Sequence, residues 1–329
     1  VPTHQRRRSA PLRVLTAFSS LALLAIAPGC RRGPEGVDLG RHVEHPEFSS
    51  ERAWSFLTSQ IANGPRYAGH VGHQRTLAWL REQLAIRADT VYAQEFTHRT
   101  ASGDTLRMAN VVARFSPALP DRVLLVAHWD TRRFADKSLD AADQKRPVPG
   151  ANDGASGVAV LMELAELFRQ QRPGIGVDLL LTDGEDYGPG AEDMFLGAKH
   201  FAARPMLSPK PRYAIVLDMV GDADARFRPE ENSLRQAPEV VKRVWGLAQA
   251  MGRDSVFSQE RREAITDDHV FLNQAGIPSI VVIDLEYGPG NLLWHTVEDD
   301  ASRVSRETLG VVGEVIAEHV YRGFPAEKK

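Results

Sequence analysis

One stretch of the chain passes directly from apolar to ionisable residues: Val123-Leu-Leu-Val-Ala-His-Trp-Asp130. Its apolar part is typical of a strand that is buried on both faces of a sheet. Three similar runs follow, at residues 177–181, 214–217 and 279–283. Because amphipathic segments alternate with these runs, the sequence predicts an α/β fold. We expect a three-layer sandwich in which helices cover both faces of a mixed, mostly parallel central sheet.

The remaining elements complete this pattern. Apolar residues recur with helical spacing, which predicts helices at residues 49–62, 73–84, 155–170, 197–203, 238–251 and 302–321. Ahead of the first buried strand, residues 90–97 and 105–115 surround the turn signal Ala101-Ser-Gly-Asp104. Two such runs around a short turn predict an antiparallel hairpin.

Length and charge restrict the class of protein. The chain has 329 residues, 43% of them hydrophobic, which is enough for one large core, and we expect residues 46–329 to form a single domain. The formal net charge is −3, and the sequence pI is near 6.4. Without a broad basic surface, no nucleic acid partner is expected.

The first thirty residues differ from the rest. A basic stretch precedes an apolar run at residues 14–27, which is typical of a signal peptide and short for a membrane-spanning helix. The ending Ala27-Pro-Gly-Cys30 resembles a bacterial lipobox, although Ala27 replaces the more usual leucine. We therefore expect an exported protein, periplasmic or in the cell envelope, attached to the membrane only by a lipid at Cys30. The alternatives are plain secretion and a cysteine that happens to lie in a signal anchor. Residues 31–45 are rich in glycine, proline and charge and predict a tether.

Acidic residues and histidines follow the predicted parallel strands. His128, Glu185 with Asp186, Asp218 and, one loop later, His295 come after the four apolar runs. In open α/β sheets ligands bind beyond the carboxyl ends of the strands, so these side chains share one rim. With Cys30 as the only cysteine, the available ligands are imidazole and carboxylate, which suits a hydrolytic type of zinc site. A carboxylate next to a ligand suits a base that carries protons.

Each of these residues also has a structural interpretation. Asp153 stands just before a predicted helix and could cap it. His128 could be a buried histidine with ordinary hydrogen bonds, Asp218 a strand-end carboxylate, and Glu185-Asp186 a solvated acidic turn. The coincidence of all the motifs at strand ends favours one metal site.

The motifs in their order resemble a known family. The order is His128-Trp-Asp130, Gly150-Ala-Asn-Asp-Gly-Ala-Ser-Gly157, Asp183-Gly-Glu-Asp186, Asp218, Asp268-His269 and His295-Thr296. It resembles the zinc-dependent aminopeptidases of the M28 superfamily and their relatives, the animal-type glutaminyl cyclases. The similarity runs from Gly64-Pro-Arg66 to the final helix and implies a zinc-dependent catalytic domain over residues 46–329.

The resemblance implies the ligands residue by residue. One zinc would be bound by Asp153, Asp186 and His295, with Glu185 as the acid and base. In the two-zinc aminopeptidases, residues matching His128 and Asp218 bind a second zinc, which the residue matching Asp153 bridges. Asp130 would then orient His128 without binding the metal itself. Asp186 is a departure, because many relatives carry glutamate there.

Smaller features favour the cyclase branch. Residues 187–195 form an insertion after the acidic pair, which resembles the cyclases, and Glu185-Asp-Tyr-Gly188 resembles their bacterial members in particular. Trp294 directly precedes His295, a pairing that also resembles the cyclases. The resemblance then implies an acidic pair of Asp218 and Asp268 and an apolar wall of Trp294 with Tyr187 or Phe195. Trp294 could instead be a core aromatic.

The expected function is therefore a glutaminyl cyclase that turns the N-terminal glutamine of peptides or proteins into pyroglutamate and releases ammonia, using one zinc. The alternative is an aminopeptidase with two zincs that releases N-terminal amino acids. A third interpretation is a binding domain without catalysis, and the intact Glu185 argues against it.

Overall fold

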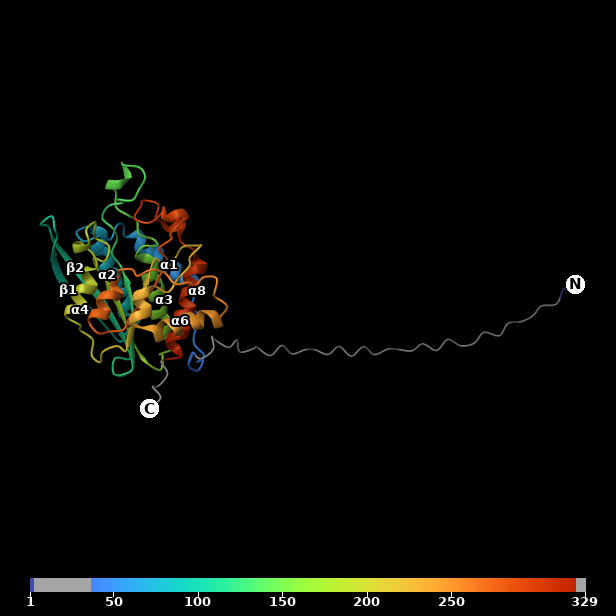
Figure 1. The fold of residues 1–329 in the computed structure, drawn as a ribbon. Coiled ribbons are helices and arrows are strands. Elements are labelled where there is room, and N and C mark those ends of the chain that lie inside the picture. The colour runs from blue at the N-terminus through green and yellow to red at the C-terminus, as the bar shows by residue number, and fades with distance from the viewer. Residues whose placement is uncertain (3–36, 324–329) are drawn as a thin grey trace. The chain divides into compact units, whose positions relative to one another are not determined.

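The computed structural model describes residues 1–2 and 37–323, and a six-stranded sheet lies at its centre (Figure 1). The spatial order of the strands is β1-β2-β4-β3-β5-β6. Their bounds are β1 Thr90–Arg99, β2 Thr105–Phe115, β3 Arg122–His128, β4 Gly176–Thr182, β5 Tyr213–Asp218 and β6 Ser279–Ile283. β4, β3, β5 and β6 are parallel, whereas β1 and β2 join the sheet antiparallel. The predicted mixed, mostly parallel sheet is confirmed.

Helices cover both faces of this sheet. The side chains of α1, α2, α3, α6 and α8 pack on one face, and those of α4 and α7 pack on the other. The helices are α1 Ser50–Ala62, α2 Val71–Ala85, α3 Ala155–Gln170, α4 Leu196–Ala203, α5 Glu231–Gln236, α6 Pro238–Ala250, α7 Asp268–Gln274 and α8 Arg306–Tyr321. Short 3₁₀ turns lie at η1 Asp143–Lys145, η2 Ala191–Asp193, η3 Pro289–Asn291 and η4 Ala301–Arg303. The three-layer sandwich is as expected.

The unbroken apolar run in β3 has a simple cause. Successive side chains of a strand point to opposite faces. Leu125 and Ala127 therefore lie in the core under α3, and Leu124 and Val126 lie in the core under α4 and α7. Every residue of β3 is buried. A strand covered on both faces gains stability from apolar residues at every position.

Helix α3 lies directly on the sheet because it has a glycine at the point of contact. A Cβ on Gly157 would lie 2.2 Å from the carbonyl oxygen of Leu217 and 3.0 Å from the Cβ of Ala127. Only a residue without a side chain allows this approach. The contact places the N-terminal end of α3, and with it Asp153, beside the ends of β3 and β5.

Three helical segments differ from the prediction. The last helix starts at Arg306 rather than at residue 302, and the separate turn η4 precedes it. Ser305 caps α8, because its side chain accepts the backbone N–H of Thr308 at 3.2 Å. The sequence analysis did not predict α5 or α7, whose six and seven residues are too few for a clear helical period.

The part of the predicted tether that the structure describes, residues 37–45, is bound to the domain. Arg322 donates from Nη1 to the carbonyl of Gly40 at 2.8 Å, and Nε2 of His45 lies 3.0 Å from Oε2 of Glu318 in α8. The side chain of Gln171 donates to the carbonyl of Glu44 at 2.7 Å. These residues are therefore a packed extension rather than a free linker, because specific partners on α8 and after α3 hold them.

Apart from residues 1–2, the predicted signal peptide with Cys30 and residues 31–36 lie outside the described residues. Export and lipidation at Cys30 therefore stay predictions. Among residues 37–323, no helix combines the length and the apolar character that crossing a membrane requires.

Candidate active site

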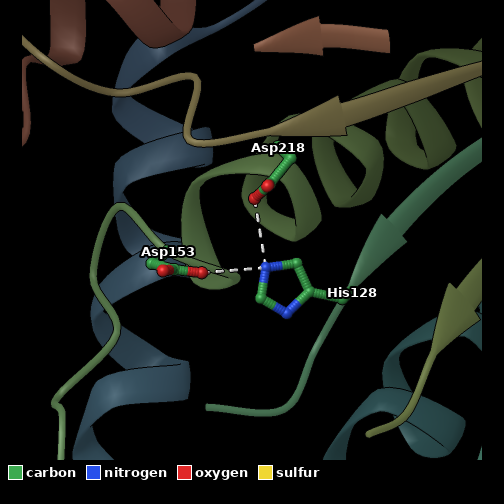
Figure 2. A group of neighbouring side chains, drawn as sticks. All are labelled: His128, Asp153 and Asp218. Carbon is green, nitrogen blue, oxygen red and sulfur yellow. Dashed lines mark hydrogen bonds and ion pairs between the residues drawn. The ribbon is translucent and has the colours of Figure 1, made fainter. Parts of the chain in front are cut away.

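The last residue of β3, His128, lies between two carboxylates (Figure 2). Its Nε2 is 3.1 Å from Oδ1 of Asp153 and 3.1 Å from Oδ1 of Asp218. Asp218 is the last residue of β5, the parallel neighbour of β3. The two strand ends thus bring together residues that are ninety positions apart in the chain.

Asp130 connects the end of β3 to the turn after β4. Its Oδ1 accepts the backbone N–H of Glu185 at 3.0 Å, and its Oδ2 accepts that of Asp186 at 3.2 Å. Oδ1 also lies 3.4 Å from Nδ1 of His128. The role expected of Asp130, orienting His128, is consistent with this position, and the carboxylate additionally holds the acidic pair.

Asp153 does not cap the helix that follows it. The residue in the N-cap position of α3 is Gly154, and no side chain caps this helix end. The Asp153 carboxylate instead points to two histidines: Oδ1 lies 3.1 Å from Nε2 of His128, and Oδ2 lies 3.4 Å from Nε2 of His295. Gly154 has a φ of +98°, and a Cβ there would lie 2.7 Å from the Asp130 carbonyl oxygen. The glycine therefore permits the tight turn that presents Asp153.

The second histidine comes from the loop after β6. Nε2 of His295 lies 3.1 Å from Oδ1 of Asp186, and its ring stacks on Trp294 with a centroid separation of 3.7 Å. His295 has a φ of +56°, in the left-handed region that residues other than glycine avoid. Such strain is found where the surrounding structure holds a functional side chain in place.

The described residues thus contain two groups of ligands that share one residue: His128 with Asp153 and Asp218, and Asp153 with Asp186 and His295. All five side chains are buried. Oδ2 of Asp186 and Nδ1 of His295 have no hydrogen-bond partner within the described chain. Buried carboxylates with neutral imidazoles are a donor set for zinc, and a buried polar atom without a partner is costly unless something binds it. The residues fit a metal centre.

Burial controls the protonation of this centre. It raises the pKa of Glu185 well above the ordinary value; the charge on His128 opposes the rise, and those on Asp186 and Asp218 add to it. Burial also acts to raise the pKa of Asp153, but hydrogen bonds with His128 and His295 outweigh it and hold that pKa low. Despite burial, the charge of Asp186 and the hydrogen bond to Asp153 raise the pKa of His295 to about 9. Binding of a metal must displace such protons, so metal affinity increases with pH.

A small cavity adjoins these ligands. Residues of both ligand groups line this cavity, together with Glu185 and with apolar side chains from the loops around it. Besides Glu185, the lining residues are Asp153, Asp186, Met194, Phe195, Asp218, Met219, Ile265, Thr266, Asp267, Ile283, Leu285, Trp294 and His295. Trp294 and Phe195 thus lie where the sequence analysis expected an apolar wall. Phe195, Met219 and His295 have positive φ angles of 58°, 48° and 56°. Backbone strain is concentrated around this cavity.

Tyr187, the other aromatic residue of the insertion, lies elsewhere. It packs with Leu106, Met108 and Leu196, and its hydroxyl accepts a hydrogen bond from Arg133 at 3.0 Å. It is not among the residues that line the cavity in the described structure. Of the two alternatives, Phe195 rather than Tyr187 therefore lies at the apolar wall, because a separate apolar cluster beside the hairpin takes up the ring of Tyr187.

The position of Asp268 also differs from the expected acidic pair. Its Oδ2 accepts a hydrogen bond from Thr182 at 2.5 Å, and no hydrogen bond joins it to Asp218 within residues 37–323. The preceding residue, Asp267, lines the cavity and has a buried Oδ2 without a partner in the described chain. Burial raises the pKa of both Asp267 and Asp268 to about 7. The change of partner follows from α7, which starts at Asp268 and turns that side chain toward β4.

The sequence analysis missed three residues around the ligands. Arg132 donates from Nη1 to Oδ1 of Asp186 at 2.8 Å, and Asp299 accepts the backbone N–H of Asp153 at 3.1 Å. Asp267 is the third. Arg132 follows the His-Trp-Asp motif by two positions, and Asp267 directly precedes the Asp-His pair. Their closeness to the motifs was the available signal, whereas nothing in the sequence marks Asp299.

A larger groove of about 1110 Å³ lies against the β1–β2 hairpin, between α2 and α4. None of the ligand residues named above lines it. The chemistry of the molecule is therefore concentrated in the small cavity rather than in the large groove.

Comparison with known proteins agrees with this site. Residues 110–320 match the family model described as Peptidase family M28. The chain belongs to peptidase family M28, whose zinc-dependent members share this fold. Its structure is similar to that of a glutaminyl cyclase from Tannerella forsythia, with a TM-score of 0.81 and 34% identity, covering 84% of this chain and 99% of that one.

Two relatives in sequence span most of the chain. Glutaminyl-peptide cyclotransferase of Bos taurus is 22% identical over 92% of this chain and 95% of its own length. The uncharacterised protein YfbL of Escherichia coli (strain K12) is 35% identical over 83% of this chain and 86% of its own. The resemblance to glutaminyl cyclases that the motifs indicated is thus confirmed.

Proposed function

We propose that this chain is a glutaminyl-peptide cyclotransferase that converts N-terminal glutamine of peptides or proteins into pyroglutamate with release of ammonia. One observation carries the proposal: a buried glutamate, Glu185, lines the same small cavity as Trp294, Phe195 and a zinc-type ligand set. Similarity to the Tannerella forsythia glutaminyl cyclase supports it.

Asp153, Asp186 and His295 would hold one zinc ion. These three residues lie at the cavity, and Asp186 keeps an unpartnered oxygen in the described structure. A zinc ion bound there supplies Lewis acidity toward the side-chain amide carbonyl of the substrate glutamine. The ligand residues come from the turn after β4, the segment just before α3 and the loop after β6, so the fold brings together three separate parts of the chain.

Glu185 would carry the proton in the reaction. The α-amine of the substrate forms a bond to its own side-chain carbonyl carbon, and the bond from that carbon to the amide nitrogen breaks. Glu185 accepts a proton from the attacking amine and gives it to the departing nitrogen, which leaves as ammonia. Because burial raises the pKa of Glu185 well above that of an ordinary carboxylate, the group holds a proton more readily and can both take and return it during the reaction.

The neighbouring groups would hold the folded substrate. Trp294 and Phe195 present apolar surface, which favours a compact substrate and keeps water away. Asp267 rather than Asp268 reaches the cavity, so we assign to Asp267 the contact with the leaving nitrogen. Asp268, held by Thr182, would support Asp267 without touching the substrate, and Asp218 also lines the cavity.

A second candidate function rests on the other ligand group. His128, Asp153 and Asp218 could hold another zinc (Figure 2). Asp153 offers a separate oxygen to each ligand group. In such an aminopeptidase, Glu185 would take a proton from water, and the N-terminal peptide bond would be cleaved. Two tightly held zincs per chain with release of free amino acids would favour this function; one zinc with no such release favours the cyclase.

An ammonia assay tests the proposal. Zinc-loaded protein is incubated with a peptide that begins with glutamine and, in parallel, with the same peptide beginning with asparagine, whose shorter side chain cannot close the same ring. We expect ammonia only from the glutamine peptide, and release slower by at least about 100-fold after Glu185→Gln. Equal ammonia from wild type and variant, or none from wild type, would contradict the proposal.

A further inference from the structure

The insertion after the acidic pair forms one wall of the cavity. Met194 and Phe195 at its end line the cavity, and its base is closed by a hydrogen bond from the backbone N–H of Phe195 to the carbonyl of Glu185, 2.8 Å long. The backbone N–H of Gly188 donates to the carbonyl of Asp193 at 3.2 Å, which closes the loop a second time. The position of this loop therefore sets the size of the space beside Glu185.

A single carboxylate attaches the loop to the β1–β2 hairpin. Oδ1 of Asp193 lies 2.7 Å from Nε2 of His98 in β1, and Oδ2 accepts the backbone N–H of Ala101 in the hairpin turn at 3.1 Å. The Asp193 side chain is 9% exposed and that of His98 26%. Both oxygens of Asp193 are thus engaged by an element that is separate from the catalytic rim. Charge-assisted hydrogen bonds of this kind are stronger than neutral ones.

Helix α4 supports the same loop from the other side. Lys199 donates from Nζ to the carbonyls of Ala191 at 3.1 Å and Met194 at 2.7 Å. Its ammonium group also lies 5.8 Å from the ring centroid of Phe195 and 5.2 Å from that of Phe271. Lys199 holds the backbone of the loop, and the contacts of Asp193 set the distance between the loop and the hairpin.

We propose that Asp193 is a positioning residue for substrate binding: through His98 and the hairpin turn it holds Met194 and Phe195 against the bound glutamine. The inference rests on the proposed cyclase function. It makes the β1–β2 hairpin, whose residues do not line the cavity, part of what determines substrate affinity. Within residues 37–323, the side-chain hydrogen bonds of Asp193 go to His98 and Ala101 and none goes to the ligands or Glu185, so the zinc site does not depend on it.

The test compares Asp193→Asn with wild type as full, zinc-loaded protein. With a glutamine peptide we expect KM to rise about tenfold, because the loop loses its charge-assisted bonds, while kcat changes less than about threefold. Zinc content stays at the wild-type value. Digestion with a protease that cuts after glutamate should cleave faster behind Glu192, which is exposed in this loop.

Two further variants isolate the contact. His98→Ala removes the partner, and a double-mutant cycle with Asp193→Asn should show that the second change adds little to the first. Asp104→Asn is the control, because Asp104 lies in the same hairpin turn but its carboxylate accepts a hydrogen bond from Ser102. It should leave KM and the cleavage rate unchanged.

The outcomes separate this inference from the proposed function. If wild type releases no ammonia, the cyclase function fails, and the cleavage rate behind Glu192 alone decides whether Asp193 fixes the loop. If wild type is active and Asp193→Asn leaves KM and cleavage unchanged, the inference is overturned. A parallel loss of kcat and zinc would overturn it too, since it would show a general structural role.

Discussion

Asp130 and Glu185 are joined by a hydrogen bond from the backbone N–H of Glu185 to Oδ1 of Asp130, 3.0 Å long. The other oxygen of Asp130 accepts the next backbone N–H, that of Asp186, at 3.2 Å. The carboxylate at the end of one strand therefore fixes the two functional residues after the neighbouring strand. A turn with two acidic side chains has no intrinsic preference for this conformation, so Asp130 supplies it.

Asp130→Asn tests this dependence. Asparagine has one carbonyl oxygen where aspartate has two, and its NH₂ group would face a backbone N–H. We expect zinc affinity to fall about 10- to 100-fold, as is typical when a group behind a metal ligand is changed. Competition with a chromophoric chelator measures the affinity. An unchanged affinity would show that the turn after β4 holds its shape without Asp130.

Glu185→Gln tests the proton carrier. Glutamine fills the same space but cannot accept the proton, so kcat should fall about 10²- to 10⁴-fold while zinc remains bound. Kinetics with a glutamine peptide and metal analysis of the same sample provide the two measurements. Glu82→Gln, on the exposed face of α2, is the matched control and should behave like wild type. A variant that keeps full activity would remove Glu185 from the mechanism.

Arg132 balances buried negative charge beside the ligands. It donates to Asp186 at 2.8 Å and, from Nε and Nη2, to Asp136 at 2.7 and 3.0 Å. Removing one partner of a buried ion pair leaves an uncompensated charge, so Arg132→Met should lower the free energy of unfolding of the metal-free protein by about 3–5 kcal/mol. Urea denaturation after chelation measures it. A loss below about 1 kcal/mol would mean that water or a neighbouring proton already compensates Asp186.

The contact between α8 and residues 37–45 should make stability depend on pH. Burial acts to raise the pKa of Glu318, but hydrogen bonds with His45, His42 and Arg322 outweigh it and lower that pKa to about 2. The same bond raises the pKa of His45 above its ordinary value of 6.5. A lowered carboxyl pKa stabilises the fold above about pH 4.5, and a raised histidine pKa stabilises it below about pH 6.5. The pair therefore contributes most to stability between these two pH values.

Glu318→Gln measures this contribution. The variant should lose more unfolding free energy at about pH 5.5 than at about pH 9, because deprotonation of His45 removes its charge attraction to Glu318 and leaves that of Arg322. Denaturant curves of wild type and variant at both pH values give the difference. Equal losses at the two pH values would show that the contact acts without the charge of His45.

The close approach of α3 to the sheet has a direct test. In Gly157→Ala the new Cβ would lie 2.2 Å from the Leu217 carbonyl oxygen, so the helix must shift. We expect a loss of about 1–3 kcal/mol in unfolding free energy, the range for an overfilled core. Gly174→Ala is the control, because nothing lies within 4 Å of a Cβ there. If Gly157→Ala loses no more than Gly174→Ala, the close approach of α3 to β5 is not what requires glycine at this position.

The sequence predicted those features that depend on regular patterns. The predicted bounds of α3 and β6 agree with the structure. A helical period extends over the whole of α3, and a continuous apolar run extends over β6. The gathering of His128, Asp186 and Asp218 followed from parallel strands, whose carboxyl ends share one edge. These inferences needed only the periodicity and the strand direction.

The details that failed depend on local geometry within one or two residues. Whether Asp267 or Asp268 faces the cavity is decided by where α7 begins, and seven residues give too short a pattern to locate that point. Whether Tyr187 or Phe195 forms the wall depends on a left-handed backbone at Phe195, which the sequence does not mark. The binding of residues 37–45 to α8 depends on partners almost three hundred positions away.

The most direct test of the central claim is the mass of the products from one peptide. A peptide that begins with glutamine followed by leucine is incubated with zinc-loaded wild-type protein, and the products are followed by mass spectrometry. We predict a single product, lighter than the peptide by one ammonia, and no free glutamine. Free glutamine together with a peptide shortened by one residue would contradict the account and make this chain an aminopeptidase.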